Sequence, residues 1–188
     1  MGEIMENKNR ERLKMLSLTA LFAALIVVCS WISVPFNVIS FTMQTFAVFF
    51  ALSFLGGKYG TLAVAVYIAV GAAGLPVFSG FRGGVGALTG ATGGYIFGFL
   101  LSGAVYILFT LKKKTPAFEI AGLFAGLFSC YTAGTLWYYF VYLGTSSAKS
   151  ISSVFLVCVV PYIIPDCVKL FAAYFLSKKL KTLLKFNN

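Results

Sequence analysis

Two ionisable side chains lie in the middle of an apolar stretch near the end of the chain. Asp166 and Lys169 occur within VVPYIIPDCVKLFAAYF, three residues apart, so a helix would place them on one face. A charged side chain at the centre of a membrane helix costs about 2.5–3.5 kcal/mol, and such residues persist where they pair or line a polar cavity. The two residues therefore form either a structural ion pair or part of a ligand site.

Neighbouring residues favour the ligand site. Pro161 and Pro165 come shortly before the pair, and proline kinks or breaks a helix and frees backbone carbonyls. A kink beside intramembrane charges is more expected at a cavity than in a bundle held by packing alone. Gln44, in VISFTMQTFAVFF, is a second polar residue in an apolar run, and it either joins this site or bonds a neighbouring helix.

The rest of the chain is too apolar for a soluble domain of its size. Of the 188 residues 60% are hydrophobic and 11% are charged, whereas soluble domains carry about 25% charged residues. A helix needs about 20 apolar residues to cross a bilayer. Six stretches are candidates: 14–34, 41–56, 60–77, 90–111, 118–142 and 152–177.

These stretches predict an all-α integral membrane protein with six transmembrane helices. The membrane domain is expected over residues 14–182, with short cytoplasmic tails at 1–13 and 183–188. The apolar stretch that begins at Leu16 is longer than the core of a signal peptide, and no clean cleavage site follows it. We therefore expect it to be retained as the first helix.

The positive charges are predicted to lie mostly on one side of the membrane. If the N-terminus is cytoplasmic, twelve of the fifteen Lys and Arg fall on the cytoplasmic side; the exceptions are Arg82, Lys149 and Lys169. This positive-inside pattern predicts that both termini are cytoplasmic, in a multi-pass protein of the bacterial plasma membrane. The net charge of +10 then reflects topology and contact with the lipid bilayer, not binding to nucleic acid.

Several kinds of chemistry are excluded by what the sequence lacks. There is no histidine, and the four cysteines are not closely spaced, so no metal site is expected. No lysine lies between Lys58 and Lys112, which excludes a phosphate-binding loop in the glycine-rich middle of the chain. A membrane-embedded enzyme built on Asp166 and Lys169 is disfavoured, because the membrane segments hold a single carboxylate.

Residues 79–98, SGFRGGVGALTGATGGYIFG, contain eight glycines. The second half fits close helix packing, since small residues recur every four positions: Gly86, Gly90, Gly94, Gly98 and Ser102. The first half, with Arg82, is expected in an outer loop. There the glycines make either a flexible connector or, over residues 79–86, a lid that closes over a ligand.

Four motifs, in order, resemble the BioY family, the biotin-specific substrate-binding (S) components of energy-coupling factor (ECF) transporters. The motifs are TMQTFAV, LPVFSGFRGG, LTGATGGY and PDCVK, and the resemblance covers nearly the whole chain. Ala91 stands where the family usually has proline, which relaxes a backbone restraint beside the site. Pro165 directly precedes Asp166, where the family often has another residue between them.

The resemblance implies that biotin is the transported ligand and that no cofactor is needed. Asp166 would accept hydrogen bonds from the ureido N–H groups of biotin, and Lys169 would bond the ureido oxygen or steady Asp166. Gln44 would donate or accept a hydrogen bond, and Arg82 would meet the valerate carboxylate as the loop closes. Lys169 remains an alternative partner for that carboxylate. The residues expected to contact the ligand are Asp166, Lys169, Gln44, Tyr95, Arg82, Phe78, Gly84, Thr92 and Trp31.

The chain has no ATPase motif, so uphill uptake needs a partner or an ion gradient. The resemblance implies an ECF transmembrane coupling subunit with two ATPase subunits. Ala20 and Ala24 in the first helix have the small-residue spacing that S components use for docking, although such alanines are also common in ordinary helix packing. The alternatives are an S component for thiamine or riboflavin and a carrier that works alone.

Overall fold

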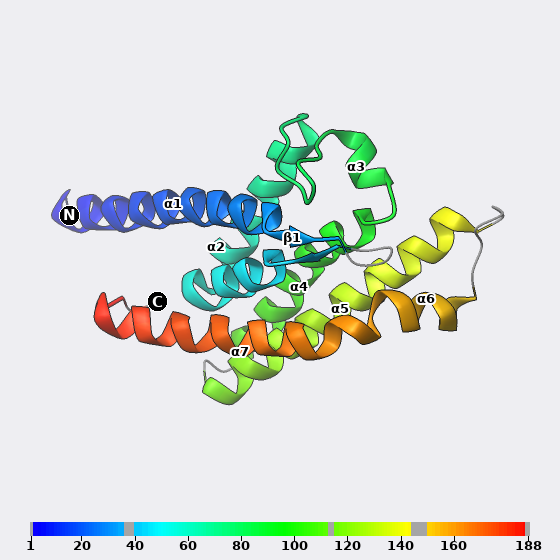
Figure 1. Cartoon of the computed structure of the whole chain (residues 1–188). Helices are drawn as coiled ribbons and strands as arrows, with labels where there is room; N and C mark the ends of the chain where they lie inside the picture. Colours follow the sequence, from blue (N-terminus) through cyan, green and yellow to red (C-terminus); the bar gives the residue numbers. More distant parts are fainter. Residues whose placement is uncertain (1, 36–39, 113–114, 144–149, 187–188) are drawn as a thin grey trace.

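The computed structural model describes residues 2–35, 40–112, 115–143 and 150–186, which form a helical bundle with one short β-ribbon (Figure 1). Five helices are long and apolar enough to cross a membrane: α1, α2, α4, α5 and α7. This agrees with the predicted all-α membrane protein. The elements are α1 (Gly2–Trp31), β1 (Ser33–Val34), β2 (Phe41–Thr42), α2 (Gln44–Ala72), α3 (Val85–Thr89), α4 (Gly93–Lys112), α5 (Pro116–Tyr142), α6 (Ile151–Cys158) and α7 (Val160–Leu183).

Helix α2 consists of two helices joined by a sharp reversal. Gly56 has φ 79° and ψ 168°, a non-helical conformation that glycine adopts at little cost. A Cβ atom added at Gly60 would lie 2.7 Å from the Cα of Leu52, although eight residues of straight helix span about 12 Å. The two halves therefore lie side by side, and they correspond to the helices predicted at 41–56 and 60–77.

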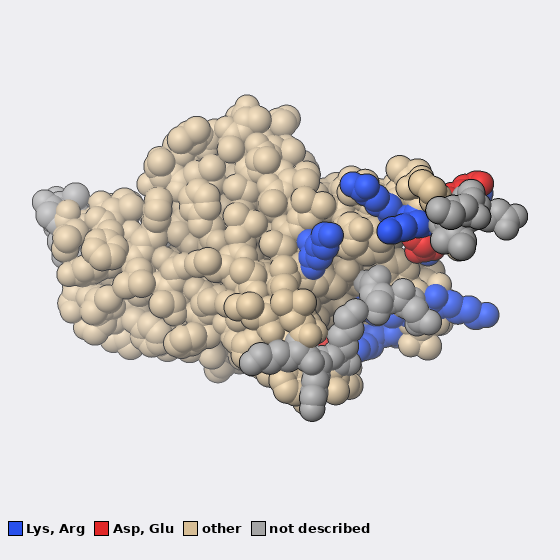
Figure 2. Space-filling model, turned by 180° about the vertical axis from the view of Figure 1, so that it is seen from behind, with Lys and Arg blue, Asp and Glu red and all other residues tan. Residues whose placement is uncertain are grey.

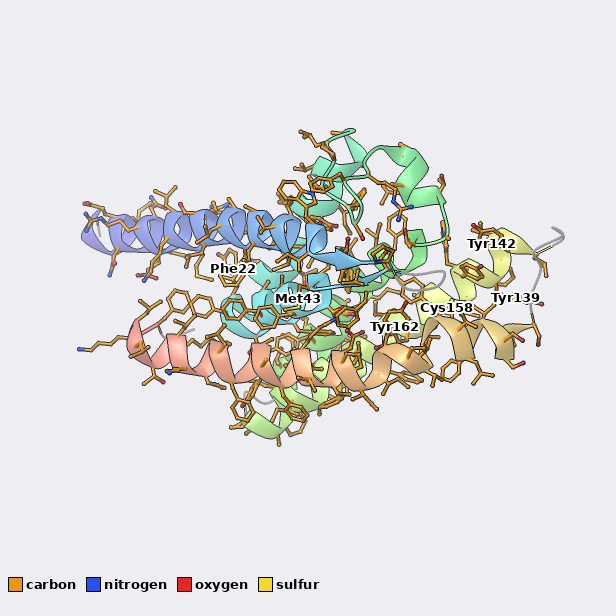
Figure 3. The ribbon with its side chains drawn as sticks, viewed as in Figure 1. Phe22, Met43, Tyr139, Tyr142, Cys158 and Tyr162 are labelled. Atoms are coloured by element: carbon orange, nitrogen blue, oxygen red, sulfur yellow. The ribbon has the colours of Figure 1, made fainter. Side chains whose placement is uncertain are left out.

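The first half of α2 is the centre of the bundle. Residues 47–55 are all buried, and α2 packs against α1, α4 and α7. Phe22 of α1, labelled in Figure 3, stacks on Phe54 with 5.3 Å between ring centroids, and Phe54 stacks on Phe186 at 5.1 Å. Every residue of this segment except Ser53 is apolar, and its close packing holds the surrounding helices together.

Helices α4 and α5 approach closely along part of the predicted small-residue stripe. A Cβ atom at Gly94 would lie 2.1 Å from the Cβ of Trp137, and one at Gly98 would lie 2.9 Å from the Sγ of Cys130. The Ser102 hydroxyl donates a hydrogen bond across the interface to the carbonyl of Gly126 at 2.7 Å. For these three positions the packing prediction is confirmed.

The same prediction is wrong for Gly86 and Gly90. Among the described residues, a Cβ atom at Gly86 would meet nothing within 4 Å, and one at Gly90 would meet only carbonyl oxygens of the preceding turn. The reason is that α3 ends at Thr89 and α4 begins only at Gly93, so these positions do not continue the face of α4.

The last apolar stretch is divided, as the prolines suggested. Val159, with φ −122° and ψ −54°, separates α6 from α7; Pro161 lies in the first turn of α7 and Pro165 lies inside it. The two ends of the chain lie at the same end of the bundle (Figure 1). Most of the Lys and Arg visible in Figure 2 gather toward that end, and α1 already begins at Gly2, within the predicted tail.

The contact at Gly94 predicts a matched pair of substitutions. Gly94→Ala inserts a methyl group against Trp137, and such overpacking costs about 1–3 kcal/mol. Gly86→Ala places the same group in open space on a helix, where alanine is favoured over glycine. We expect the first variant to lower the melting temperature in detergent and the second to leave it unchanged or raised. Equal melting temperatures would contradict the assignment of this close approach.

Candidate ligand-binding site

A cavity lies at the end of the bundle away from the chain termini. Its walls are mainly apolar. Polar side chains enter it from several helices, as is typical of small-molecule sites. Seven of the nine predicted ligand residues line it: Gln44, Phe78, Arg82, Thr92, Tyr95, Asp166 and Lys169.

Asp166 and Lys169 form a buried ion pair on the cavity wall. The ammonium Nζ of Lys169 lies 2.8 Å from the carboxylate Oδ1 of Asp166, and the two residues are 5% and 6% exposed. The other carboxylate oxygen, Oδ2, accepts a hydrogen bond from the Tyr131 hydroxyl at 2.7 Å. The pair is therefore an ion pair that also lines the cavity, and its contact with a ligand stays a prediction.

The β-ribbon supplies further partners for Lys169. The Lys169 ammonium donates to the backbone carbonyl of Thr42 at 2.6 Å and lies over the ring of Phe41, 3.7 Å from its centroid. Strand β2 carries both residues and pairs in antiparallel fashion with β1. A cation on an aromatic face is stabilised further where water is excluded. Lys169 thus joins α7 to the segment that precedes α2.

Gln44 is the first residue of α2 and is held by the second half of the same helix. Its amide nitrogen Nε2 donates to the hydroxyl of Tyr67 at 3.0 Å. Tyr67 is buried, and its ring meets that of Phe78 edge to face at 5.4 Å. The reversal of α2 makes this bond possible, since the two residues are 23 positions apart. The bond leaves the carbonyl oxygen of the Gln44 side chain available to accept a hydrogen bond.

The loop that carries Phe78 and Arg82 is a tight turn fixed by backbone hydrogen bonds. The N–H of Phe78 donates to the carbonyl of Arg82 at 2.9 Å, and the N–H of Gly84 donates to the carbonyl of Gly71 at 2.8 Å. Between them Gly80 has φ 72° and Phe81 has φ 55°. Arg82 is exposed, and its Nε donates to the carbonyl of Ser79 at 3.1 Å.

Trp31 and Gly84 are not among the described residues that line the cavity. The indole N–H of Trp31 donates to the carbonyl of Pro76 at 2.8 Å, and its ring stacks on Phe81 at 5.2 Å. Gly84 has φ 80° and is the residue before α3. Both residues thus support the loop beside the cavity, and direct contact with a ligand stays a prediction for them.

Tyr95 enters the cavity near the start of α4. A Cβ atom at Gly134 of α5 would lie 2.3 Å from the Tyr95 ring, so the ring packs flush on the backbone of that helix. A Cβ atom at Gly93 would lie 1.7 Å from the carbonyl oxygen of Leu88, which restricts this position to glycine. The glycines of LTGATGGY therefore allow the close turn that aims Tyr95 and Thr92 at the cavity.

Sequence reasoning missed Tyr131, Thr42 and Tyr162 as residues of the site. Tyr131 and Tyr162 line the cavity from α5 and α7, and Tyr162 lies beside Cys158 at the junction of α6 and α7 (Figure 3). Leu127, Cys130 and Tyr131 share one face of α5, a spacing that could have indicated a cavity-facing stripe. Thr42 contributes through its backbone carbonyl, which no side-chain pattern reveals.

Among the described residues, no three His, Cys, Asp or Glu side chains come together to form a metal site. The polar side chains of the described residues that line the cavity are three tyrosines, five serines or threonines, one amide, a paired carboxylate and ammonium, and one guanidinium. They can hold an organic molecule that has N–H donors, a carbonyl acceptor and an anionic group.

The sequence of the chain matches a known protein family. Residues 5–186 match the BioY family. The chain belongs to this family. The prediction from the four motifs is therefore confirmed, over almost the full length of the chain.

Proteins similar to the chain include the following two relatives and one solved structure. The biotin transporter BioY of Thermotoga maritima is 43% identical over 163 residues, 87% of this chain and 93% of the relative. The probable biotin transporter BioY of Pyrococcus horikoshii is 35% identical over 168 residues, 89% of this chain and 96% of the relative. A crystal structure of the S-component for biotin from an ECF-type ABC transporter has the same fold, with TM-score 0.79 and 24% identity, over 93% of this chain and 94% of that one.

Proposed function

We propose that this BioY-family chain is a membrane S component that binds biotin from the outside of the cell for uptake. The observation that carries the proposal is the cavity lined by Asp166, Lys169 and Gln44 within apolar walls. It is supported by the names of the relatives, which are given as biotin transporters. Those names identify transporters, and no enzymatic reaction is proposed.

Biotin complements these groups chemically. Its ureido head has two N–H donors and one carbonyl acceptor, which suit the Asp166 carboxylate and the Lys169 ammonium with the Gln44 amide. Its bicyclic ring and alkyl chain are apolar, and the rings of Phe78 and Tyr95 offer matching walls. Its valerate carboxylate suits a cation at the mouth of the cavity.

The membrane topology that we propose has six spans and cytoplasmic termini. The six spans are α1, the two halves of α2, α4, α5 and the segment made of α6 and α7 together. Both ends of the chain lie at the end of the bundle where Lys and Arg gather, which supports a cytoplasmic location by the positive-inside rule (Figures 1 and 2). The cavity then opens outward, and the membrane is the bacterial plasma membrane.

Substitution of Asp166 tests the binding site. We expect Asp166→Asn to weaken biotin binding by about 1.5–3 kcal/mol, or roughly 10- to 150-fold, because a charge-assisted hydrogen bond to the ureido group is lost. The matched control is Glu119→Gln, which alters an ion-paired carboxylate, 2.8 Å from Lys178, that is not among the described residues lining the cavity. Titration calorimetry on purified protein measures both.

Competition binding and a transport assay distinguish biotin binding from the alternative functions. Competition with thiamine and riboflavin should leave biotin binding unchanged if the site is specific for biotin. An S component for either vitamin would bind that vitamin and not biotin. A carrier that works alone would move labelled biotin into sealed vesicles without any other protein. Equal small effects of Asp166→Asn and Glu119→Gln would assign the Asp166–Lys169 pair a structural role only.

Arg82 is proposed as the partner of the valerate carboxylate, on a lid formed by residues 79–86. It is exposed and lines the cavity, whereas the charge of Lys169 is already balanced by Asp166. We expect Arg82→Gln to weaken binding of biotin about fivefold and binding of biotin methyl ester less than twofold, since the ester has no full negative charge. Equal losses for both ligands would contradict the assignment.

Energised uptake is proposed to depend on an ECF transmembrane coupling subunit and two ATPase subunits. Ala20 and Ala24 lie on the exposed face of α1, whereas Ala23 of the same helix is 6% exposed and packs inward. This leaves the predicted docking face open to a partner helix, as the small-residue spacing requires.

Bulky substitutions on this face test the docking proposal. We expect Ala20→Trp combined with Ala24→Trp to preserve biotin binding by the isolated protein and to abolish uptake in cells that contain the coupling and ATPase subunits. Ala104→Trp, at an exposed alanine of α4, is the control and should preserve both activities. Loss of binding in the double variant would show that the face supports the fold of the chain itself.

A further inference from the structure

The Tyr131 hydroxyl forms a contact that the proposed binding mode has not used. It donates to Oδ2 of Asp166 at 2.7 Å, while Oδ1 accepts from the Lys169 ammonium at 2.8 Å. The two donors come from different helices, α5 and α7, so the plane of the carboxylate is fixed from two directions. A carboxylate has about four acceptor positions, and these bonds leave about half of them for a ligand.

These bonds also decide which charge on a ligand the site tolerates. The negative charge of Asp166 is shared between the ammonium and the hydroxyl, and the Lys169 ammonium lies in the same cavity wall. A neutral head group with N–H donors can use the remaining acceptor positions without changing this balance. A cationic head group would meet the ammonium without an unshared negative charge to compensate the repulsion, which is strong where water is excluded.

We propose that Tyr131 is a positioning residue that makes the site selective for a neutral cyclic urea over a cationic analogue. It acts through Asp166 by holding the carboxylate in one orientation before the ligand arrives, which lowers the entropy cost of binding. By donating to Oδ2 it also withdraws part of the negative charge that a cation would seek. The proposal rests on the proposed biotin-binding function and adds the residue that sets the selectivity.

The test compares biotin with 2-iminobiotin, whose guanidinium-like head is cationic at neutral pH. We expect Tyr131→Phe to weaken biotin binding about fivefold to tenfold, because one oxygen of Asp166 loses its donor and the carboxylate is no longer held. Binding of 2-iminobiotin should be unchanged or tighter, so the ratio of the two affinities falls by about the same factor. Tyr139→Phe, on the same helix and toward its outer end, should change neither affinity (Figure 3).

A double variant distinguishes positioning of the Asp166 carboxylate by Tyr131 from direct contact between Tyr131 and the ligand. If Tyr131 acts through Asp166, Tyr131→Phe should alter biotin affinity less than twofold in protein that already carries Asp166→Asn. A loss that persists there would mean that Tyr131 touches the ligand itself. If Tyr131→Phe lowers the affinities for biotin and 2-iminobiotin equally, the role of Tyr131 is purely structural. If the variant keeps its affinity for biotin, Tyr131 does not position the carboxylate.

Failure of the proposed function gives a different result. If the unsubstituted protein does not bind biotin, the function is wrong and the role of Tyr131 is wrong with it. If the protein binds biotin and Asp166→Asn has no effect, the function stands but the site is elsewhere, which also overturns the role of Tyr131. If Asp166→Asn weakens binding and Tyr131→Phe leaves the affinity ratio unchanged, only the role of Tyr131 fails.

Discussion

The cost of burying Asp166 and Lys169 among apolar helices governs the architecture of this end of the molecule. An ion pair out of water is stable only where the remaining donors and acceptors are also satisfied. Here α5 supplies the Tyr131 hydroxyl and β2 supplies the Thr42 carbonyl and the Phe41 ring. The two charges neutralise each other within α7, but their remaining donors and acceptors are satisfied only where α5, α7 and β2 are docked together, so the site is complete only in the packed bundle.

This constraint gives the cavity two chemically different ends. At the paired end, the charges compensate one another and what remains is hydrogen-bonding capacity, which suits a polar but uncharged head group. At the mouth, Arg82 is exposed and hydrogen-bonded to the Ser79 carbonyl, so its charge is suited to an anion. The proposed orientation of biotin, head inward and carboxylate outward, follows from this difference in charge balance.

Glycine makes the surrounding bundle possible at two kinds of position. At Gly56 it permits the reversal that folds α2 back on itself, which places Gln44 within reach of Tyr67. At Gly94 and Gly98 it removes the side chain where α4 meets α5, and at Gly134 it admits the Tyr95 ring. The first use sets the path of the chain, and the second sets the distance between helices and hence the shape of the cavity.

The sequence by itself determined the membrane class, the family, the gathering of most basic residues at one end of the bundle and seven of the residues that line the cavity. Each of these depends on local composition or on motifs contiguous in the chain. Only the tertiary structure decided the partners of the pair, since the Thr42 carbonyl lies 127 positions from Lys169 and any residue has such a carbonyl. It also showed that Gly86 does not continue the face of α4 that packs against α5, because α3 ends at Thr89 and α4 begins only at Gly93.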